Sequence, residues 1–182
     1  MEDIDIIKRV LEGNRDYYAL IVDKYKGPIF NLAYRMTGSY DDASDLAQET
    51  FTRAYKNLSR FNTEKKFFTW LYTISLNLVR NHLKWNKKET FYDSPENTEL
   101  TRSWQADIDD SEHALIKRQT IYQLNMCLRR LPGDLKEALV LRFYQDLPFE
   151  DVSVVLDISL SAAKMRVYRG LEKLQELMGD NQ

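Results

Sequence analysis

The sequence predicts an all-α protein of two small helical domains joined by an acidic linker. The chain has 182 residues, enough for one domain or two small ones. It contains only 6 Gly and 4 Pro, and apolar residues recur at helical spacing in both halves. Between the halves, residues 89–112 lose this periodicity and become rich in Ser, Thr, Asn, Asp and Glu. We therefore expect domains over residues 1–88 and 113–182, separated by a flexible linker.

Charge divides the chain in the same way, although its net charge is only −2. From residue 56 to residue 88 Glu64 is the only acid, among the bases Lys56, Arg60, Lys65, Lys66, Arg80, Lys84, Lys87 and Lys88. The linker is acidic, with Arg102 as its one strong base, and basic residues return near the C-terminus at Lys164, Arg166, Arg169 and Lys173. Because two basic lobes flank an acidic linker, local charge says more about binding partners than net charge does.

The first half should be helical throughout. Apolar residues at helical spacing predict a helix over residues 15–37. Gly27 and Pro28 indicate a kink or a restart within it, because Pro is well tolerated at a first helical position. Gly38 is a plausible C-cap.

Ser39 or Asp41 can cap the next helix, which should run to about Leu58. A polar loop, residues 59–66, then leads to a third helix over residues 67–84. One face of that third helix should pack in the core, through Phe67, Trp70, Leu71, Ile74 and Leu78. The opposite face is polar and consists of Thr73, Asn77, Arg80, Asn81 and Lys84. This polar face is either ordinary solvated surface or, given its two asparagines one turn apart, a ligand-contacting face.

The second half ends in a predicted helix-turn-helix. An amphipathic helix should stop at Pro132-Gly133, and a second should follow over residues 134–144. A short helix then begins at Pro148, and a turn at residues 157–159 leads to a long helix over residues 161–178. We expect the long helix to bury Ala163, Val167, Leu171, Leu174 and Met178. Its outward residues would be Ser161, Lys164, Met165, Tyr168 and Arg169, which suit DNA contact or simply form the basic surface of a helical hairpin.

Several function classes find no support in the sequence. No apolar run approaches a membrane span, and residues 1–16 lack the layout of a secretory signal, so we expect a cytoplasmic protein without membrane insertion. Cys127 is the only cysteine and is expected to be buried and inert, with a redox sensor as the alternative. The two histidines lack metal-ligand spacing, and no nucleophile motif or phosphate loop occurs. We expect no catalytic residues, no metal and no cofactor.

Three stretches make the chain similar to a known family. They are DDASDLAQETFTRAYKNLSRF (41–61), FFTWLYTISLNLVRNHLK (67–84), and LRRLPGDLKEALVLRFYQDLPFEDVSVVLDIS (128–159) with AAKMRVYRGLEKL (162–174). In this order, and with an acidic linker before the last, they resemble the extracytoplasmic-function (ECF) sigma factors of bacterial RNA polymerase, in the sigma-70 family. The resemblance covers nearly the whole chain. It implies sigma region 2 in residues 1–88 and sigma region 4 in residues 113–182.

The resemblance also implies the function of an alternative, non-catalytic sigma factor, with partners and site residues. The polymerase core would be bound through a coiled coil of its largest subunit and the flap of its second-largest subunit. The residues facing the polymerase would be Asp45, Gln48, Glu49 and Arg53. Those recognising the melted minus-ten strand would be Phe61, Lys65, Lys66, Trp70, Tyr72, Asn77, Arg80, Asn81 and Lys84, although Trp70 can equally be core. Those reading the minus-thirty-five duplex would be Ser161, Lys164, Met165, Arg166, Tyr168 and Arg169. An anti-sigma factor is an expected further partner, and the acidic linker would enter basic channels of the polymerase.

Some positions depart from the family pattern. Ser161-Ala162-Ala163 stands where Gly-Thr-Val is common, Met165 where a small hydroxyl residue is frequent, and Glu64-Lys65-Lys66 where glycine is typical. These departures bear on the promoter sequence rather than on the fold. Two other functions stay open: a free-standing regulator using the helix-turn-helix, and a decoy that sequesters a regulator of sigma factors.

Overall fold

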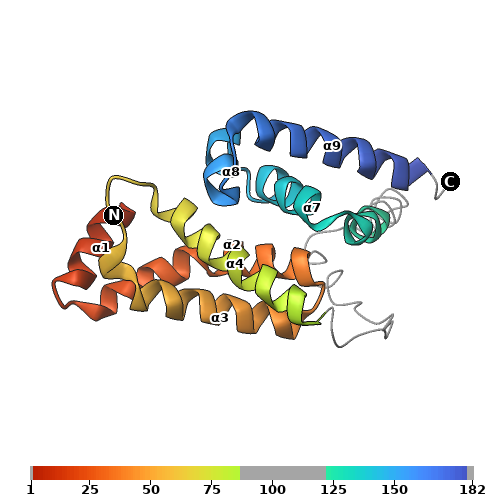
Figure 1. Ribbon diagram of the computed structural model, residues 1–182. Coiled ribbons are helices and arrows are strands. Elements are labelled where there is room, and N and C mark those ends of the chain that lie inside the picture. Colours follow the sequence, from red (N-terminus) through yellow and green to blue (C-terminus); the bar gives the residue numbers. More distant parts are fainter. Residues whose placement is uncertain (1, 87–121, 180–182) are drawn as a thin grey trace, which may run out of the picture.

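A computed structural model of the chain describes residues 2–86 and 122–179, and all regular structure in these ranges is helical. The elements form two lobes, one from each end of the chain (Figure 1). This confirms the all-α, two-lobed fold. The predicted linker, residues 89–112, and the start of the helix that precedes Pro132 lie outside the described residues.

The N-terminal lobe consists of α1 (Asp3–Leu11), α2 (Tyr18–Thr37), α3 (Tyr40–Lys56) and α4 (Phe67–Asn86), with short 3-10 turns at Arg15–Tyr17 and Leu58–Arg60. α1 was not predicted from the sequence as a helix of its own. It buries Ile6, Ile7 and Val10 against the rest of the lobe. Its acidic Asp3 accepts hydrogen bonds from Lys24 and Tyr25 of α2. These contacts attach the N-terminal helix to the bundle.

α2 excludes the restart, one of the two alternatives predicted at Gly27 and Pro28. It runs without a restart through Gly27 and Pro28. Pro28 supplies no N–H to the helical ladder, a cost that would favour a break. Ile29 and Leu32, just after it, are fully buried, so packing in the core stabilises the continuous helix despite that loss.

The predicted caps between α2 and α3 are confirmed. Gly38 adopts a left-handed conformation, with φ at 76°, and ends α2. Ser39 is the N-cap of α3, and its side-chain oxygen accepts from the backbone N–H of Asp42 at 3.3 Å. α3 ends at Lys56, slightly before the predicted Leu58.

The C-terminal lobe contains a helical segment over residues 122–130, then α7 (Gly133–Leu139), α8 (Phe149–Leu156) and α9 (Leu160–Gly179). The predicted stop at Pro132 is confirmed. The helix expected over residues 134–144 changes to a π turn at Val140–Tyr144. Cys127 is buried, as expected.

The predicted helix-turn-helix is formed by α8 and α9. Asp157 takes a left-handed conformation at the end of α8, with φ at 55°. Ser159 caps α9, since its hydroxyl accepts from the N–H of Ala162 at 3.2 Å. Ile158, expected to be buried in the turn, is half-buried. These features set the direction in which α9 leaves the turn.

One core prediction for α9 is wrong. Ala163 and Val167 are buried as expected, but Leu171 is 38% exposed. Gly170 is buried instead, and a Cβ placed on it would lie 2.9 Å from Cγ of Leu139. The helix approaches α7 so closely at Gly170 that this residue, rather than Leu171, faces the core.

The two lobes pack against each other. The C-terminal lobe lies over one side of the N-terminal bundle, so that α8 packs on α4 and the Val140–Tyr144 turn lies against α2 (Figure 1). Among the described residues, no helix is long and apolar enough to cross a membrane.

Candidate nucleic-acid interface

α4 carries the central part of the predicted minus-ten set on one polar face. Asn77, Asn81 and Lys84 are exposed on three successive turns of one face. The opposite side of α4 is buried through Phe67, Leu71 and other apolar residues, which fixes the orientation of this face. The asparagine amides are therefore presented outward, where they could bond base edges.

The aromatic members of the set lie at the other end of α4. The ring of Phe61 is 5.4 Å from that of Phe67 and 5.2 Å from that of Trp70. Phe61 is buried and Trp70 is half-buried against the core. These two rings thus support the loop before α4, and only Trp70 retains some exposed surface.

Tyr72 is more deeply placed than the rest of the set. Only 5% of it is exposed, and its hydroxyl donates to Oε1 of Gln145 at 2.8 Å. Burial raises the pKa of Tyr72 to about 12, so the phenol stays protonated and can keep donating. Gln145 belongs to the C-terminal lobe, so this contact joins the two lobes.

Two cations of the set also reach the C-terminal lobe. Arg80 donates to Glu137 of α7, and Lys66 donates to Asp151 of α8. Lys65, next to Lys66, is exposed. The structure thus brings Asn77, Asn81 and Lys84 together in the open, and holds Lys66, Tyr72 and Arg80 at the lobe–lobe contact.

α9 presents the predicted minus-thirty-five set on its first turns. Ser161, Lys164, Met165 and Tyr168 are exposed on one face, with Arg169 exposed beside them and Arg166 half-buried to the side. Lys164 lies over the ring of Phe149, 5.9 Å from its centroid, and that ring is 6.3 Å from the ring of Tyr168. α8 thereby supports the side chains that α9 projects into solvent.

The predicted polymerase-facing residues lie along α3. Asp45, Gln48 and Arg53 are exposed, and Glu49 is half-exposed and accepts from Nε of Arg53 at 2.6 Å. The exposed ion pair contributes little to stability, so its residues are available for contact with a partner.

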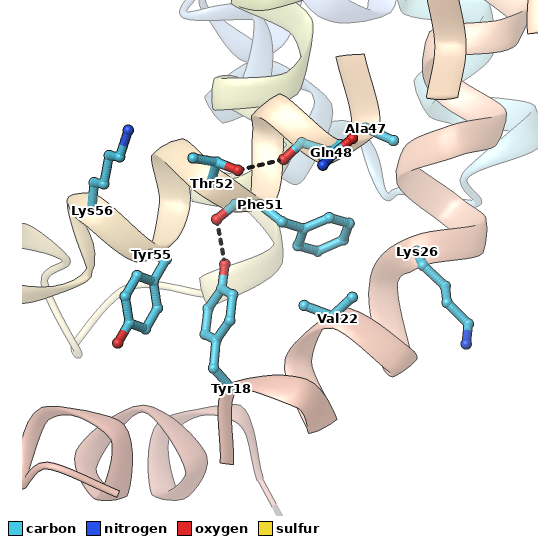
Figure 2. A pocket seen from close by; sticks show the side chains of 9 residues that line it. All are labelled: Tyr18, Val22, Lys26, Ala47, Gln48, Phe51, Thr52, Tyr55 and Lys56. Atoms are coloured by element: carbon cyan, nitrogen blue, oxygen red, sulfur yellow. Dashed lines mark hydrogen bonds between the residues drawn. The ribbon is translucent and has the colours of Figure 1, made fainter. Parts of the chain in front are cut away.

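A groove between α2 and α3 adjoins these residues, and the sequence reading did not find it (Figure 2). Its volume is about 500 Å³, and its floor is apolar. The lining residues are Tyr18, Val22, Lys26, Ala47, Gln48, Phe51, Thr52, Tyr55 and Lys56. The hydroxyl of Tyr18 donates to the carbonyl of Phe51 at 2.8 Å and fixes one wall. Gln48 belongs both to the groove and to the predicted polymerase-facing set.

The sequence reading also missed the acidic residues that contact the minus-ten set. Glu137 and Asp151 carried no prediction, and both are buried. Their burial comes from the packing of the other lobe, and no local periodicity signals it.

Comparisons with known proteins agree with this geometry. The family model for sigma-70 region 2 matches residues 21–89, and that for sigma-70 region 4 matches residues 121–174. The chain is 33% identical over 178 residues to the ECF RNA polymerase sigma factor SigW of Bacillus subtilis, covering 96% of this chain and 95% of that protein.

Two solved structures share the fold. The structure of CnrH in complex with the cytosolic domain of CnrY has a TM-score of 0.73 at 22% identity, covering 99% of both chains. The sigma factor RpoE in complex with the anti-sigma factor NepR, from Bartonella quintana, has a TM-score of 0.70 at 20% identity, covering 91% of this chain and 98% of that one. With a relative this similar along almost its whole length, the chain belongs to the ECF sigma factors of the sigma-70 family, which direct bacterial RNA polymerase to promoters.

Proposed function

We propose that this sigma factor recognises the two promoter elements with two separate helical faces. The exposed face of α4, with Asn77, Asn81 and Lys84, binds the melted minus-ten strand, together with Lys65, Lys66, Arg80 and the aromatic residues Phe61, Trp70 and Tyr72. The exposed start of α9, with Lys164, Met165 and Tyr168, reads the minus-thirty-five duplex together with Ser161, Arg166 and Arg169. One observation supports this proposal: on α4 and on α9, the polar face lies opposite a face that is buried in the core. The two helices belong to the lobes that match sigma regions 2 and 4.

The chemistry of the α4 face suits an unpaired strand. Amides can bond base edges, an aromatic ring can stack on a base, and cations can hold the phosphates. Binding the unpaired strand lowers the free energy of promoter opening, and this needs no bond chemistry from the sigma factor. The role is therefore that of a non-catalytic initiation subunit.

The polymerase core docks along α3, through Asp45, Gln48, Glu49 and Arg53, on the coiled coil of the largest subunit. The groove between α2 and α3 extends this surface, because Gln48 is common to both. The C-terminal lobe would meet the flap of the second-largest subunit. We assign region 2 to residues 1–88, the linker to residues 89–112 and region 4 to residues 113–182.

An anti-sigma factor is the expected regulatory partner, as in the similar structure of RpoE with NepR. The working place of the chain is the bacterial cytoplasm, where the polymerase and the promoters are. The basic lobes meet DNA there, while the acidic linker enters basic channels of the enzyme.

Transcription from two matched templates tests the assignment of α4. One template is a duplex promoter, and the other carries an unpaired bubble over the minus-ten element. With sigma-free core polymerase, Asn77→Ala and Asn81→Ala should each reduce initiation on both templates, because base capture is lost. Asn31→Ala, an exposed asparagine on α2, is the matched control and should initiate normally.

Two outcomes would contradict the proposed function. A folded protein that binds the core without supporting initiation would indicate a decoy. A protein that binds promoter DNA tightly on its own, with no affinity for the core, would indicate a free-standing regulator.

A further inference from the structure

Two carboxylates of the C-terminal lobe form ion pairs with cations of the N-terminal lobe. Glu137 accepts from Nε and Nη2 of Arg80 at 2.9 and 2.7 Å, and Asp151 accepts from Nζ of Lys66 through both oxygens, at 2.9 and 2.8 Å. The two carboxylate side chains are only 9% and 7% exposed. A guanidinium binds carboxylates and phosphates alike through two parallel N–H···O bonds, so Glu137 holds the edge of Arg80 that a phosphate would bind.

The cations in these pairs belong to the proposed minus-ten surface. A strand phosphate could bind the Nε and Nη2 edge of Arg80 only by displacing Glu137. The side chain of Lys66 is 60% exposed, so there Asp151 competes with a phosphate for the charge of the ammonium group. Tyr72 of the same surface is buried and bonded to Gln145. The C-terminal lobe therefore covers part of the minus-ten surface while the reading side chains of α9, such as Lys164 and Tyr168, remain exposed.

Other polar groups also join the two lobes. Arg35 lies over the ring of Tyr144 at 3.4 Å from its centroid, and Nζ of Lys136 donates to the carbonyl of Met36 at 3.1 Å. Nε2 of Gln145 is buried and finds no hydrogen-bond partner in the described part of the chain. The free-energy cost of removing such charged and polar groups from water offsets much of the stability that their contacts contribute. Contacts of this kind can hold two lobes together and still be exchanged for others.

We propose that the C-terminal lobe acts as an internal competitor of promoter DNA, with Glu137 and Asp151 taking the places of strand phosphates on Arg80 and Lys66. This inference rests on the proposed minus-ten role of those two cations. In the closed arrangement Tyr72 and Arg80 of the minus-ten surface are engaged by the C-terminal lobe, whereas Asn77, Asn81, Lys84 and the minus-thirty-five surface are exposed. The lobes must separate before the unpaired strand can use the whole minus-ten surface.

The test uses the full chain and short single-stranded DNA of random sequence at low salt, because phosphate contacts do not depend on sequence. The double variant Glu137→Gln, Asp151→Asn keeps the shape of both side chains and removes their charge. Its matched control is Glu150→Gln, Glu172→Gln, which removes the same charge from exposed positions of the same lobe. Lobe separation is followed in parallel by spin labels on Glu64→Cys and Val154→Cys, both exposed sites, with the buried Cys127 replaced by alanine.

The proposal expects the label distance to increase and the DNA to bind at least about tenfold more tightly in the double variant, and neither to change in the control. The gain in affinity should disappear when Arg80→Ala is added to the double variant. If the lobes separate but the double variant binds DNA no more tightly than the wild-type protein, the carboxylates do not compete with DNA and the proposal is overturned. If the lobes stay together, the carboxylates do not hold them and the proposal is overturned as well. If an open variant binds no DNA at all, the proposed minus-ten role of the cations is itself wrong.

Discussion

Arg80 and Glu137 come from different lobes and form an ion pair through two hydrogen bonds of 2.9 and 2.7 Å. The residues are 57 positions apart in the sequence. The hydrogen bonds to Glu137 raise the pKa of Arg80 above its usual value, so this guanidinium is charged at any pH the protein meets. The pair thus links the proposed DNA-binding surface of one lobe to the other lobe.

A double-mutant cycle on Arg80→Ala and Glu137→Ala should measure a coupling of about 1 to 3 kcal/mol, as for contacting residues in a shielded network. The measurement is urea unfolding followed by a probe in each lobe. The exposed pair Arg53 and Glu49 is the matched control and should couple by only about 0.3 to 0.5 kcal/mol. Equal, small couplings for the two pairs would show that the lobe–lobe pair has no structural role.

Lys136 should make stability depend on pH. Burial, with a smaller effect from the nearby charge of Arg129, lowers the pKa of Lys136 from 10.5 to about 8. Between these values the folded chain binds fewer protons than the unfolded chain, so the free energy of unfolding rises with pH. The penalty for burying the charged amine is full below about pH 8 and fades as the pH approaches 10.5.

Lys136→Met should therefore remove a rise in the urea midpoint that the wild-type protein shows above about pH 8. Lys8→Met, at an exposed lysine of α1, should keep the wild-type pH profile. Identical profiles for all three proteins would mean that Lys136 is not buried in solution.

Gly170→Ala should destabilise the C-terminal lobe. The new Cβ would lie 2.9 Å from Cγ of Leu139, which is buried and has little room to move. Overpacking of this kind costs about 1 to 3 kcal/mol, which outweighs the gain of up to about 1 kcal/mol from the better helix propensity of alanine. Thermal unfolding checks this, with Gly179→Ala as the control because nothing lies within 4 Å of its added Cβ. A stabilised Gly170→Ala protein would contradict the close approach of α7 and α9.

Lys164→Ala should reduce initiation at promoters that carry a minus-thirty-five element. Loss of one base or phosphate contact corresponds to about 1 to 3 kcal/mol, or roughly tenfold or more in promoter affinity. The control is Lys173→Ala, a lysine further along α9 that forms an ion pair with Glu176. An equal loss in both variants would indicate a general effect of charge rather than reading by the start of α9.

The helices, their caps and the helix-turn-helix could be predicted from the sequence because local patterns encode them. Ser39 and Gly38 act at the helix ends where such residues are favoured, and the apolar stripe of α4 does face the core. The prediction for Leu171 was wrong because periodicity identifies only the apolar side of a helix. The close approach of α7 decides that Gly170, and not Leu171, faces the core. Gly170 has no apolar side chain to signal that approach.

The lobe–lobe contact could not be predicted in the same way. Lys136, Glu137 and Asp151 are charged residues on helices, and such residues are almost always solvated unless they are paired. Their partners lie 57 to 100 positions away, so no local pattern reveals them. The predicted site residues Lys66, Tyr72 and Arg80 were recognised by resemblance to the family, and only the packing of the lobes shows that they are already engaged.

Promoter recognition by the two helical faces is best tested by transcription in vitro with sigma-free bacterial core polymerase on a library of promoter sequences. We expect initiation that depends on this protein and selects two short elements. Preferences at the upstream element should shift in Lys164→Ala, and those at the downstream element should shift in Asn77→Ala. Absence of initiation by a folded protein that binds the core would contradict this proposal, as would selected elements that neither variant alters.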